Sequence, residues 1–168
     1  MQQMWSPWRS QYIQSFKDET AQPACFLCAA RDAVGDEEQH LVVHRAESCF
    51  VIMNRYPYNS GHVMVVPQRH TGALEELTAD ELAEIMLTIR DTDKVLRHVF
   101  RPHGMNIGAN LGRTAGAGLP DHLHFHLVPR WNGDTNFMPV LADVKVVSES
   151  LEDSRRKISE AYETLRQA

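Results

Sequence analysis

A helix with recognisable signals at both ends divides this chain and limits the folds that it can adopt. Thr78 followed by Glu81 forms the pattern T-x-x-E, typical of a helix N-terminus whose free N–H groups are capped by side chains. Apolar residues then recur at helical spacing, at Leu82, Ile85, Met86, Ile89, Leu96 and Val99. Arg101-Pro102 ends the pattern, because proline cannot continue a helix. We therefore expect one long helix in the middle of the chain.

Short strands are predicted on both sides of this helix. Before it, the segments HLVVHR, SCFVIMN and HVMVVP are typical of strands, with turns at residues 46–47 and in RYPYNSG. After it, MNIGANL and HLHFHLVP predict two more strands, separated by the glycine-rich loop GRTAGAGLPD. A further strand near residues 140–147 and a charged helix from about residue 151 to 166 complete the chain. This order favours the α+β class with a mainly antiparallel sheet.

Composition narrows the class of protein. The 168 residues suit one domain, and the apolar fraction of 43% is enough for a buried core. A net charge of −5 without a basic run does not favour general binding to nucleic acid or to a membrane surface. The N-terminus lacks the apolar segment of a signal peptide, and three cysteines do not make a disulfide framework, so we expect a cytoplasmic protein. The opening forty residues look irregular.

Three histidines, His122, His124 and His126, alternate with apolar residues in HLHFHLV. On a strand this spacing places all three imidazoles on one face. A polar solvated face would explain one histidine better than three. A metal site and nucleophilic catalysis by one imidazole are the two functional interpretations.

At this point the chain resembles the histidine triad (HIT) superfamily, whose signature is His-φ-His-φ-His-φ-φ, with φ apolar. The resemblance extends to VIMNRYPYNSGHVMVVPQRH and GMNIGANLG and covers roughly residues 40–131. NRYPYNSGH, NLGRTAGAG and VPRWNGDTNF are most similar to the branch that includes bacterial diadenosine tetraphosphate phosphorylases. The resemblance implies a single HIT domain, with residues 1–39 as an N-terminal arm, 40–131 as the core block and 132–168 as a C-terminal strand and helix.

The resemblance also implies roles for particular residues. His124 would be the nucleophile that attacks the α-phosphorus of a nucleotide and carries a covalent nucleotidyl group. His126 would hydrogen-bond the phosphate and help the leaving group depart, and His62 would orient the site. Asn54 matches the family's ribose-side asparagine, and Asn110 lies where the family places an amide beside the phosphates, although turn capping explains either asparagine alone equally well.

The loop before the triad departs from the common family pattern. Gly116 and Gly118 could turn backbone N–H groups toward a phosphate, which makes them candidate substrate-binding residues. Most HIT proteins carry Gln-Ser/Thr where this chain has Gly118-Leu119. A side-chain contact to the leaving group is therefore missing, which affects substrate choice more than reaction type.

The sequence also contains a candidate metal site. Cys25-x-x-Cys28 has the spacing of a metal-binding pair, although two packed thiols would also explain it. The resemblance adds His70 and His122 and implies a structural zinc bound by Cys25, Cys28, His70 and His122. Cys49, within an apolar strand, is expected to be a core thiol.

Together these features predict a nucleotidyl transferase or hydrolase that acts on a dinucleoside polyphosphate, with phosphate or water as the acceptor. The alternatives are hydrolysis of nucleoside phosphoramidates or adenylyl conjugates, a nucleotide-binding protein with little turnover, and a metalloenzyme that uses the three triad histidines as ligands. We expect no organic cofactor, no nucleic acid or membrane partner, and a homodimer or higher homo-oligomer.

Overall fold

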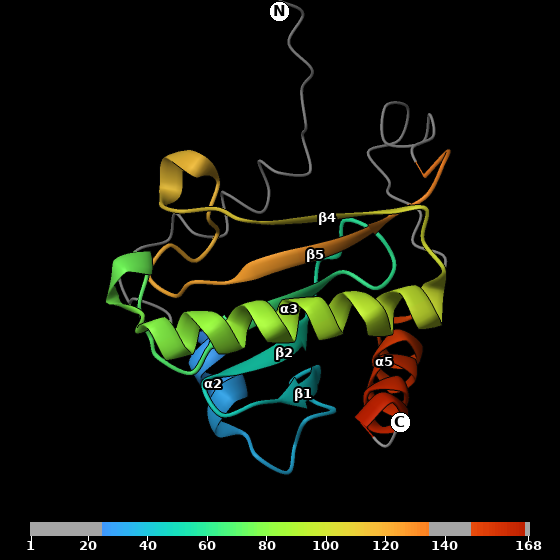
Figure 1. Ribbon diagram of the computed structural model, residues 1–168, viewed down its shortest axis with the longest axis horizontal. Helices are drawn as coiled ribbons and strands as arrows, with labels where there is room; N and C mark the ends of the chain where they lie inside the picture. Colours follow the sequence, from blue (N-terminus) through green and yellow to red (C-terminus); the bar gives the residue numbers. More distant parts are fainter. Residues whose placement is uncertain (1–24, 135–148, 167–168) are drawn as a thin grey trace, which may run out of the picture.

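The computed structural model describes residues 25–134 and 149–166 (Figure 1). It contains a five-stranded antiparallel sheet with strand order β1-β2-β3-β5-β4. The strands are β1 (Val42–Arg45), β2 (Cys49–Met53), β3 (Val63–Pro67), β4 (Gly104–Ala109) and β5 (Phe125–Arg130). The helices are α2 (Phe26–Asp32), α3 (Ala79–Phe100) and α5 (Leu151–Arg166), with short 3₁₀ turns η1 (Leu74–Glu76) and η2 (Arg113–Ala115). The predicted α+β class is confirmed.

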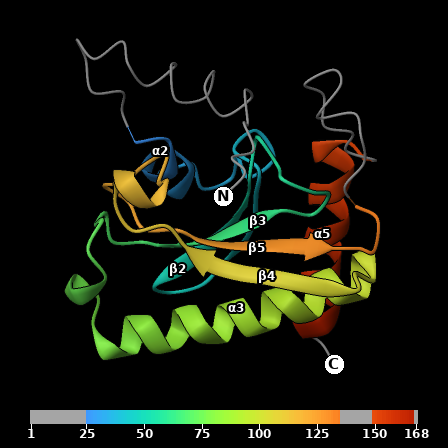
Figure 2. The same ribbon diagram turned by 90° about the horizontal axis from the view of Figure 1, so that it is seen from above.

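Helices lie on both sides of the sheet, α3 and α5 on one side and the short α2 on the other (Figure 2). Cys49, Val51 and Met53 of β2 belong to the larger core, which includes residues of α3 and α5. The intervening Phe50 and Ile52 pack with α2 on the opposite face. Because successive side chains of a strand point to opposite faces, β2 is apolar at every position, and all five of its residues are buried.

Helix α3 begins and ends where the sequence predicts. The Thr78 side chain accepts from the N–H of Glu81, and the Glu81 side chain accepts from the N–H of Thr78, so the capping box is complete. Met86, however, is 60% exposed, so this member of the apolar pattern does not face the core. The buried face of α3 includes Thr88 and Thr92 instead. The Thr88 hydroxyl accepts from the Cys49 thiol, and the Thr92 hydroxyl donates to the Thr88 carbonyl. An apolar pattern alone does not detect threonines buried in this way.

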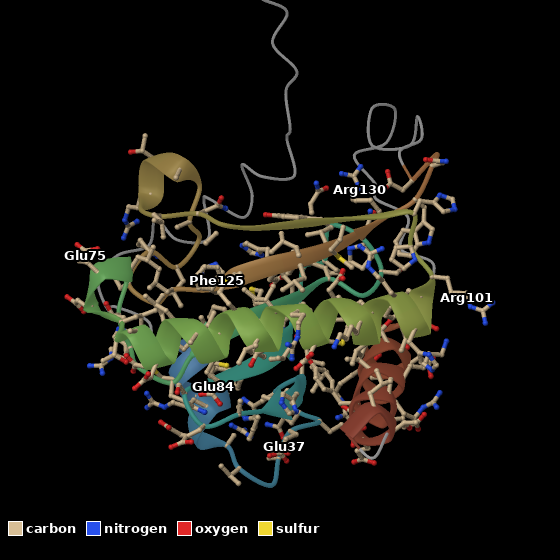
Figure 3. All side chains as sticks on the ribbon, in the orientation of Figure 1. Glu37, Glu75, Glu84, Arg101, Phe125 and Arg130 are labelled. Atoms are coloured by element: carbon tan, nitrogen blue, oxygen red, sulfur yellow. The ribbon has the colours of Figure 1, made fainter. Side chains whose placement is uncertain are left out.

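The acidic side of α3 also holds the turn between β1 and β2. Glu84, labelled in Figure 3, accepts from the N–H groups of Glu47, at 3.1 Å, and Ser48, at 2.6 Å. The predicted turn at residues 46–47 is confirmed, and a helix carboxylate satisfies its backbone donors.

Two local predictions are corrected. The opening forty residues are not wholly irregular, because α2 spans Phe26–Asp32. This helix is seven residues long and has no side-chain cap, so burial of Leu27 and Ala30, rather than a local sequence signal, stabilises it. Strand β5 begins at Phe125, not at His122. The Leu123 N–H donates to the Thr71 carbonyl at 2.7 Å, so this part of the chain pairs with a loop rather than with a strand.

The remaining predicted elements stand as follows. Strands β1 to β4 and helix α5 are confirmed, with ends that differ by one to a few residues. The predicted strand near residues 140–147 lies outside the described residues. Within the described residues, no helix combines the length and apolarity needed to cross a membrane.

Candidate active site

The second and third triad histidines lie on the α2 side of the sheet, at the start of β5. His126 is the second residue of β5, next to Phe125, which Figure 3 labels. His126 lies opposite Met64 of β3, which packs in the α2-side cluster. The rings of His124 and His126 are 4.9 Å apart and nearly perpendicular. A group of phosphate size can therefore contact both imidazoles.

A chain of hydrogen bonds fixes the tautomer of His126. The backbone N–H of Tyr58 donates to His62 Nδ1 at 3.1 Å, so this nitrogen carries no proton. His62 must then hold its proton on Nε2, which lies 2.9 Å from His126 Nδ1 and donates to it. The proton of a neutral His126 is therefore on Nε2.

His124 has the opposite tautomer. Its Nδ1 lies 2.8 Å from the backbone carbonyl of His122, and a carbonyl can only accept, so Nδ1 carries the proton. The lone pair of His124 is therefore on Nε2. A nucleophilic nitrogen and a hydrogen-bond donor thus lie side by side.

Burial keeps both imidazoles neutral near pH 7. His124 is 8% exposed, and desolvation lowers its pKa below the usual value for histidine. Desolvation, with a smaller contribution from His124, lowers the pKa of His126 to about 4. Neutral imidazoles are the form that a nucleophile requires.

A polar cluster around the buried Asn59, which the sequence did not reveal, holds the turn that precedes His62. Asn59 is 8% exposed, and its Nδ2 donates to the Pro129 carbonyl at 3.0 Å and to Asp134 Oδ2 at 2.8 Å. Asp134 also accepts from Arg130, whose guanidinium holds the pKa of that carboxyl well below its usual range. This cluster fastens the turn that supplies the Tyr58 N–H to the end of β5. Asn59 and Asp134 are 75 positions apart, so no local pattern could have paired them.

The predicted substrate-binding residues Asn54, Asn110 and Gly116 make hydrogen bonds within the turns and loops that carry them. Asn54 Oδ1 accepts from the N–H of Tyr56, and its backbone N–H donates to the His62 carbonyl, so it caps the turn beside the site. Asn110 Nδ2 lies 3.5 Å from the Gly116 carbonyl. The Gly116 N–H donates to the Arg113 carbonyl within the loop. Roles in substrate binding for these residues and for Gly118 stay predictions.

The first triad histidine faces a different partner, a cluster of two cysteines and two histidines. His122 Nδ1 lies 3.2 Å from Cys25 Sγ and 3.6 Å from Cys28 Sγ. Cys28 Sγ lies 3.1 Å from His70 Nδ1. All four ligand atoms lie within 4.8 Å of one another, so the cluster could hold a metal ion.

The chemistry of the donors fits a four-coordinate metal. His122 Nε2 donates to the Pro67 carbonyl at 3.0 Å, which leaves the Nδ1 lone pair directed at the sulfurs. Metal-binding histidines are commonly fixed in this way by a carbonyl on their second nitrogen. Two sulfurs and two nitrogens are the donor set of structural zinc sites.

A glycine permits the close approach that brings His70 to His122. A Cβ at Gly72 would lie 2.2 Å from the Pro120 carbonyl oxygen, which is shorter than any tolerated contact. The chain around residues 70–72 can therefore pack against residues 120–123 only with glycine at this position.

The triad does not act as a single metal site. His122 faces the cysteines, whereas His126 Nδ1 is engaged by His62. Among the described residues, the one group of three or more possible metal ligands is the cysteine–histidine cluster, and it includes neither His124 nor His126. The alternative of a metalloenzyme with three triad ligands is therefore not supported.

Comparisons with known proteins show which family the chain resembles. The HIT domain matches residues 36–133. The chain is 40% identical over 164 residues to the AP-4-A phosphorylase of Mycobacterium tuberculosis, covering 95% of this chain and 83% of that protein. It is 31% identical over 123 residues to the asymmetrical bis(5'-nucleosyl)-tetraphosphatase of Schizosaccharomyces pombe, covering 73% of this chain and 64% of that protein. A zinc-bound histidine triad family protein of Mycobacterium smegmatis has the same fold, with a TM-score of 0.67, 24% identity, and coverage of 86% of this chain and 96% of that chain.

Proposed function

Because this chain belongs to the HIT domain family, we propose that it is an enzyme that transfers a nucleotidyl group from a dinucleoside polyphosphate such as diadenosine tetraphosphate. The relatives named AP-4-A phosphorylase and bis(5'-nucleosyl)-tetraphosphatase support this substrate class. One observation carries the proposed chemistry. Each ring is fixed through its Nδ1, so His124 has a lone pair on its unbound Nε2 and His126 has a proton on its Nε2.

In the proposed reaction, His124 Nε2 attacks the α-phosphorus. A P–N bond forms while the P–O bond to the leaving phosphate chain breaks, and His126 Nε2–H donates to a phosphate oxygen. The His122 carbonyl continues to accept from His124 Nδ1–H as the ring gains positive charge, which stabilises that charge. An acceptor, phosphate or water, then attacks the same phosphorus and releases His124.

The products formed from diadenosine tetraphosphate test this proposal and decide the acceptor. ADP that forms only when inorganic phosphate is present, together with ATP, identifies a phosphorylase. AMP and ATP in both conditions identify a hydrolase. If neither reaction occurs, nucleoside phosphoramidates and adenylyl conjugates are the next substrates to assay, and nucleotide binding without turnover on any of them contradicts the proposal.

Replacing the nucleophile gives the first prediction. His124→Asn removes the covalent route, so kcat should fall by about 10⁴-fold or more, as for nucleophiles of other enzymes. Nucleotide affinity, measured by calorimetry, should change little, because Asn54 and His126 remain. The exposed His98→Asn variant is the control and should keep the wild-type rate. Near-normal turnover by His124→Asn would refute the mechanism.

We also infer that Cys25, Cys28, His70 and His122 hold a structural zinc. Their contacts support this inference, as does the relative described as zinc-bound. When bound, zinc supplies a cross-link between distant parts of the chain, and it has no role in the bond-breaking steps. Protein purified without chelator should contain one zinc per chain by elemental analysis, and protein without metal would contradict the inference.

A homodimer or larger homo-oligomer is the remaining part of the proposal. Strand β4 is at the edge of the sheet, and within the described part of the chain its outer edge has no strand partner. Ile107 in β4 and Leu111 beyond it are about half exposed, at 50% and 48%. An unpaired edge with apolar side chains is a surface that proteins usually cover. Light scattering of the purified protein tests this point.

A further inference from the structure

Cys25 and Cys28 differ from the third cysteine of the chain in their access to solvent. Both are only partly buried, and His70 beside them is exposed. Their Sγ atoms lie within 4.8 Å of each other, and two residues separate them along the chain. Cys49, by contrast, is fully buried and bonded to Thr88. A small oxidant can therefore reach the first two sulfurs much more easily than the third.

The cysteine pair contacts His122, the residue whose carbonyl holds the nucleophile His124. Cys25 Sγ contacts His122 Nδ1 at 3.2 Å, and the backbone carbonyl of His122 accepts from His124 Nδ1–H at 2.8 Å. The position of His122 thus affects both the cysteine cluster and the tautomer of His124.

We propose that Cys25 and Cys28 form a redox modification site, at which a hydroperoxide converts them to a disulfide and thereby slows the reaction at His124. The inference rests on the proposed function and on the zinc proposed above. In the step, the two thiolates lose two electrons and an S–S bond forms. The O–O bond of the hydroperoxide breaks, and its oxygens leave as water and an alcohol, or as two waters from hydrogen peroxide, after uptake of two protons. The zinc ion keeps its oxidation state and is released.

Loss of the metal follows from the chemistry of the ligands. Thiolates bind zinc, whereas the neutral sulfurs of a disulfide do not, so only the imidazoles of His70 and His122 would remain. Among the described residues, the hydrogen bond from His122 Nε2 to the Pro67 carbonyl would remain.

The peptide that carries the His122 carbonyl also carries the Leu123 N–H, which donates to the Thr71 carbonyl, and Thr71 follows the released ligand His70. We therefore expect this loop to shift and the His122 carbonyl to hold the His124 ring less firmly. We expect kcat to fall by about 10- to 100-fold, the usual effect of losing a group that orients a site, with a much smaller change in KM.

The test uses the full chain loaded with zinc and treated with hydrogen peroxide. Three quantities are followed together: zinc released to a coloured chelator, the Cys25–Cys28 disulfide by mass spectrometry after alkylation, and cleavage of diadenosine tetraphosphate. We expect one zinc released per disulfide, a parallel fall in kcat, and recovery after addition of a thiol reductant and zinc. Cys49→Ser should respond as the wild type does, because the buried thiol takes no part.

A fourth readout separates this inference from the proposed function. Nitrogen-15 NMR of the histidine rings reports the His124 tautomer whether or not the substrate is cleaved. The single Nδ1–H form should be present in the reduced protein and lost on oxidation. If the untreated protein cleaves no dinucleoside polyphosphate, the proposed function fails, while zinc, disulfide and NMR still decide the inference. No disulfide in excess peroxide, zinc release without a disulfide, or a disulfide that leaves both kcat and the His124 signal unchanged would each overturn it.

Discussion

The side chains of His124 and His126 differ in function because different neighbours hold them. The His122 carbonyl fixes one ring, and His62 fixes the other. Each imidazole is identical in isolation, and the partner on one nitrogen decides what the other nitrogen can do. The order of residues in HLHFHLV cannot supply this information, because His62 is 64 positions from His126.

The low pKa of His126 makes protein stability depend on pH. The folded-state pKa is about 4, below the value near 6.5 of an unfolded chain. Between these values the unfolded state takes up a proton that the folded state does not, so the free energy of unfolding falls as pH decreases through this window. The contribution is at most about 1.4 kcal/mol per pH unit.

His126→Gln should therefore lose less stability than the wild type between pH 6.5 and pH 4. Urea unfolding at intervals across this range measures the two free energies of unfolding. Their difference should be constant above pH 7 and should shift in favour of the variant as the pH is lowered. Parallel curves over the whole range would show that His126 does not resist protonation in the folded protein.

Asn59 is expected to stabilise both the fold and the site. Asn59→Ala removes the donor to the Pro129 carbonyl and to Asp134 from a buried position, which should cost about 1–3 kcal/mol. The exposed Asn132→Ala is the matched control and should change stability by less than about 0.5 kcal/mol. Equal urea midpoints for the two variants would show that the buried hydrogen bonds contribute nothing.

At the scale of elements, one turn joins the active site to the end of α3. Gly61 precedes His62, has φ of +73°, and lies against the ring of Phe100. A Cβ at this position would be 2.7 Å from that ring. Both the backbone conformation and the contact therefore favour glycine.

Gly61→Ala should be more destabilising than Gly35→Ala. Gly35 also has a left-handed backbone, with φ of +92°, but a Cβ there would meet nothing within 4 Å. Gly35→Ala should cost about 1–2 kcal/mol for the conformation alone. Gly61→Ala should cost this and about 1–3 kcal/mol more for the clash. Thermal unfolding of both variants measures the difference, and similar midpoints would mean that Phe100 moves aside freely.

Which elements the sequence could predict depends on how local their causes are. Helix α3 was predictable because Thr78 and Glu81 are three residues apart, and α5 because of its charged helical pattern. Helix α2 was not, since burial of Leu27 against the sheet forms it. The start of β5 was misplaced because Thr71 pairs with Leu123 across about fifty residues.

The candidate site shows the same division. The spacing of Cys25 and Cys28 and of the triad identified the reactive residue types, and the resemblance supplied His70 and His62. The resemblance also assigned His122 to the cysteines rather than to the reacting pair. The tautomers of His124 and His126, which depend on the His122 carbonyl and on His62, came only from the folded chain.

For the whole molecule, the cysteine–histidine cluster connects parts that lie far apart in the sequence. Cys25 and His122 are 97 positions apart, and Cys28 and His70 are 42 apart. A ligand that binds only the folded chain stabilises it, by about 4 kcal/mol when present at a thousand times its dissociation constant.

Removing the metal should therefore lower the midpoint of thermal unfolding. Protein treated with a strong chelator is compared with the same protein after zinc is restored. The midpoint should fall and then recover, and Cys28→Ser should have the low midpoint with or without added zinc. A midpoint that the chelator leaves unchanged in zinc-containing protein would show that the cluster does not stabilise the fold.

Both reacting imidazoles are held by main-chain atoms, the His122 carbonyl directly and the Tyr58 N–H through His62. Every amino acid supplies the same carbonyl and, proline apart, the same N–H. Alanine at Tyr58 would remove ring contacts with His62 and His126 but keep the N–H, so it cannot test the hydrogen bond that places the His126 proton on Nε2. The informative change is an amide-to-ester replacement, which puts an oxygen where the Tyr58 nitrogen is and leaves every side chain in place.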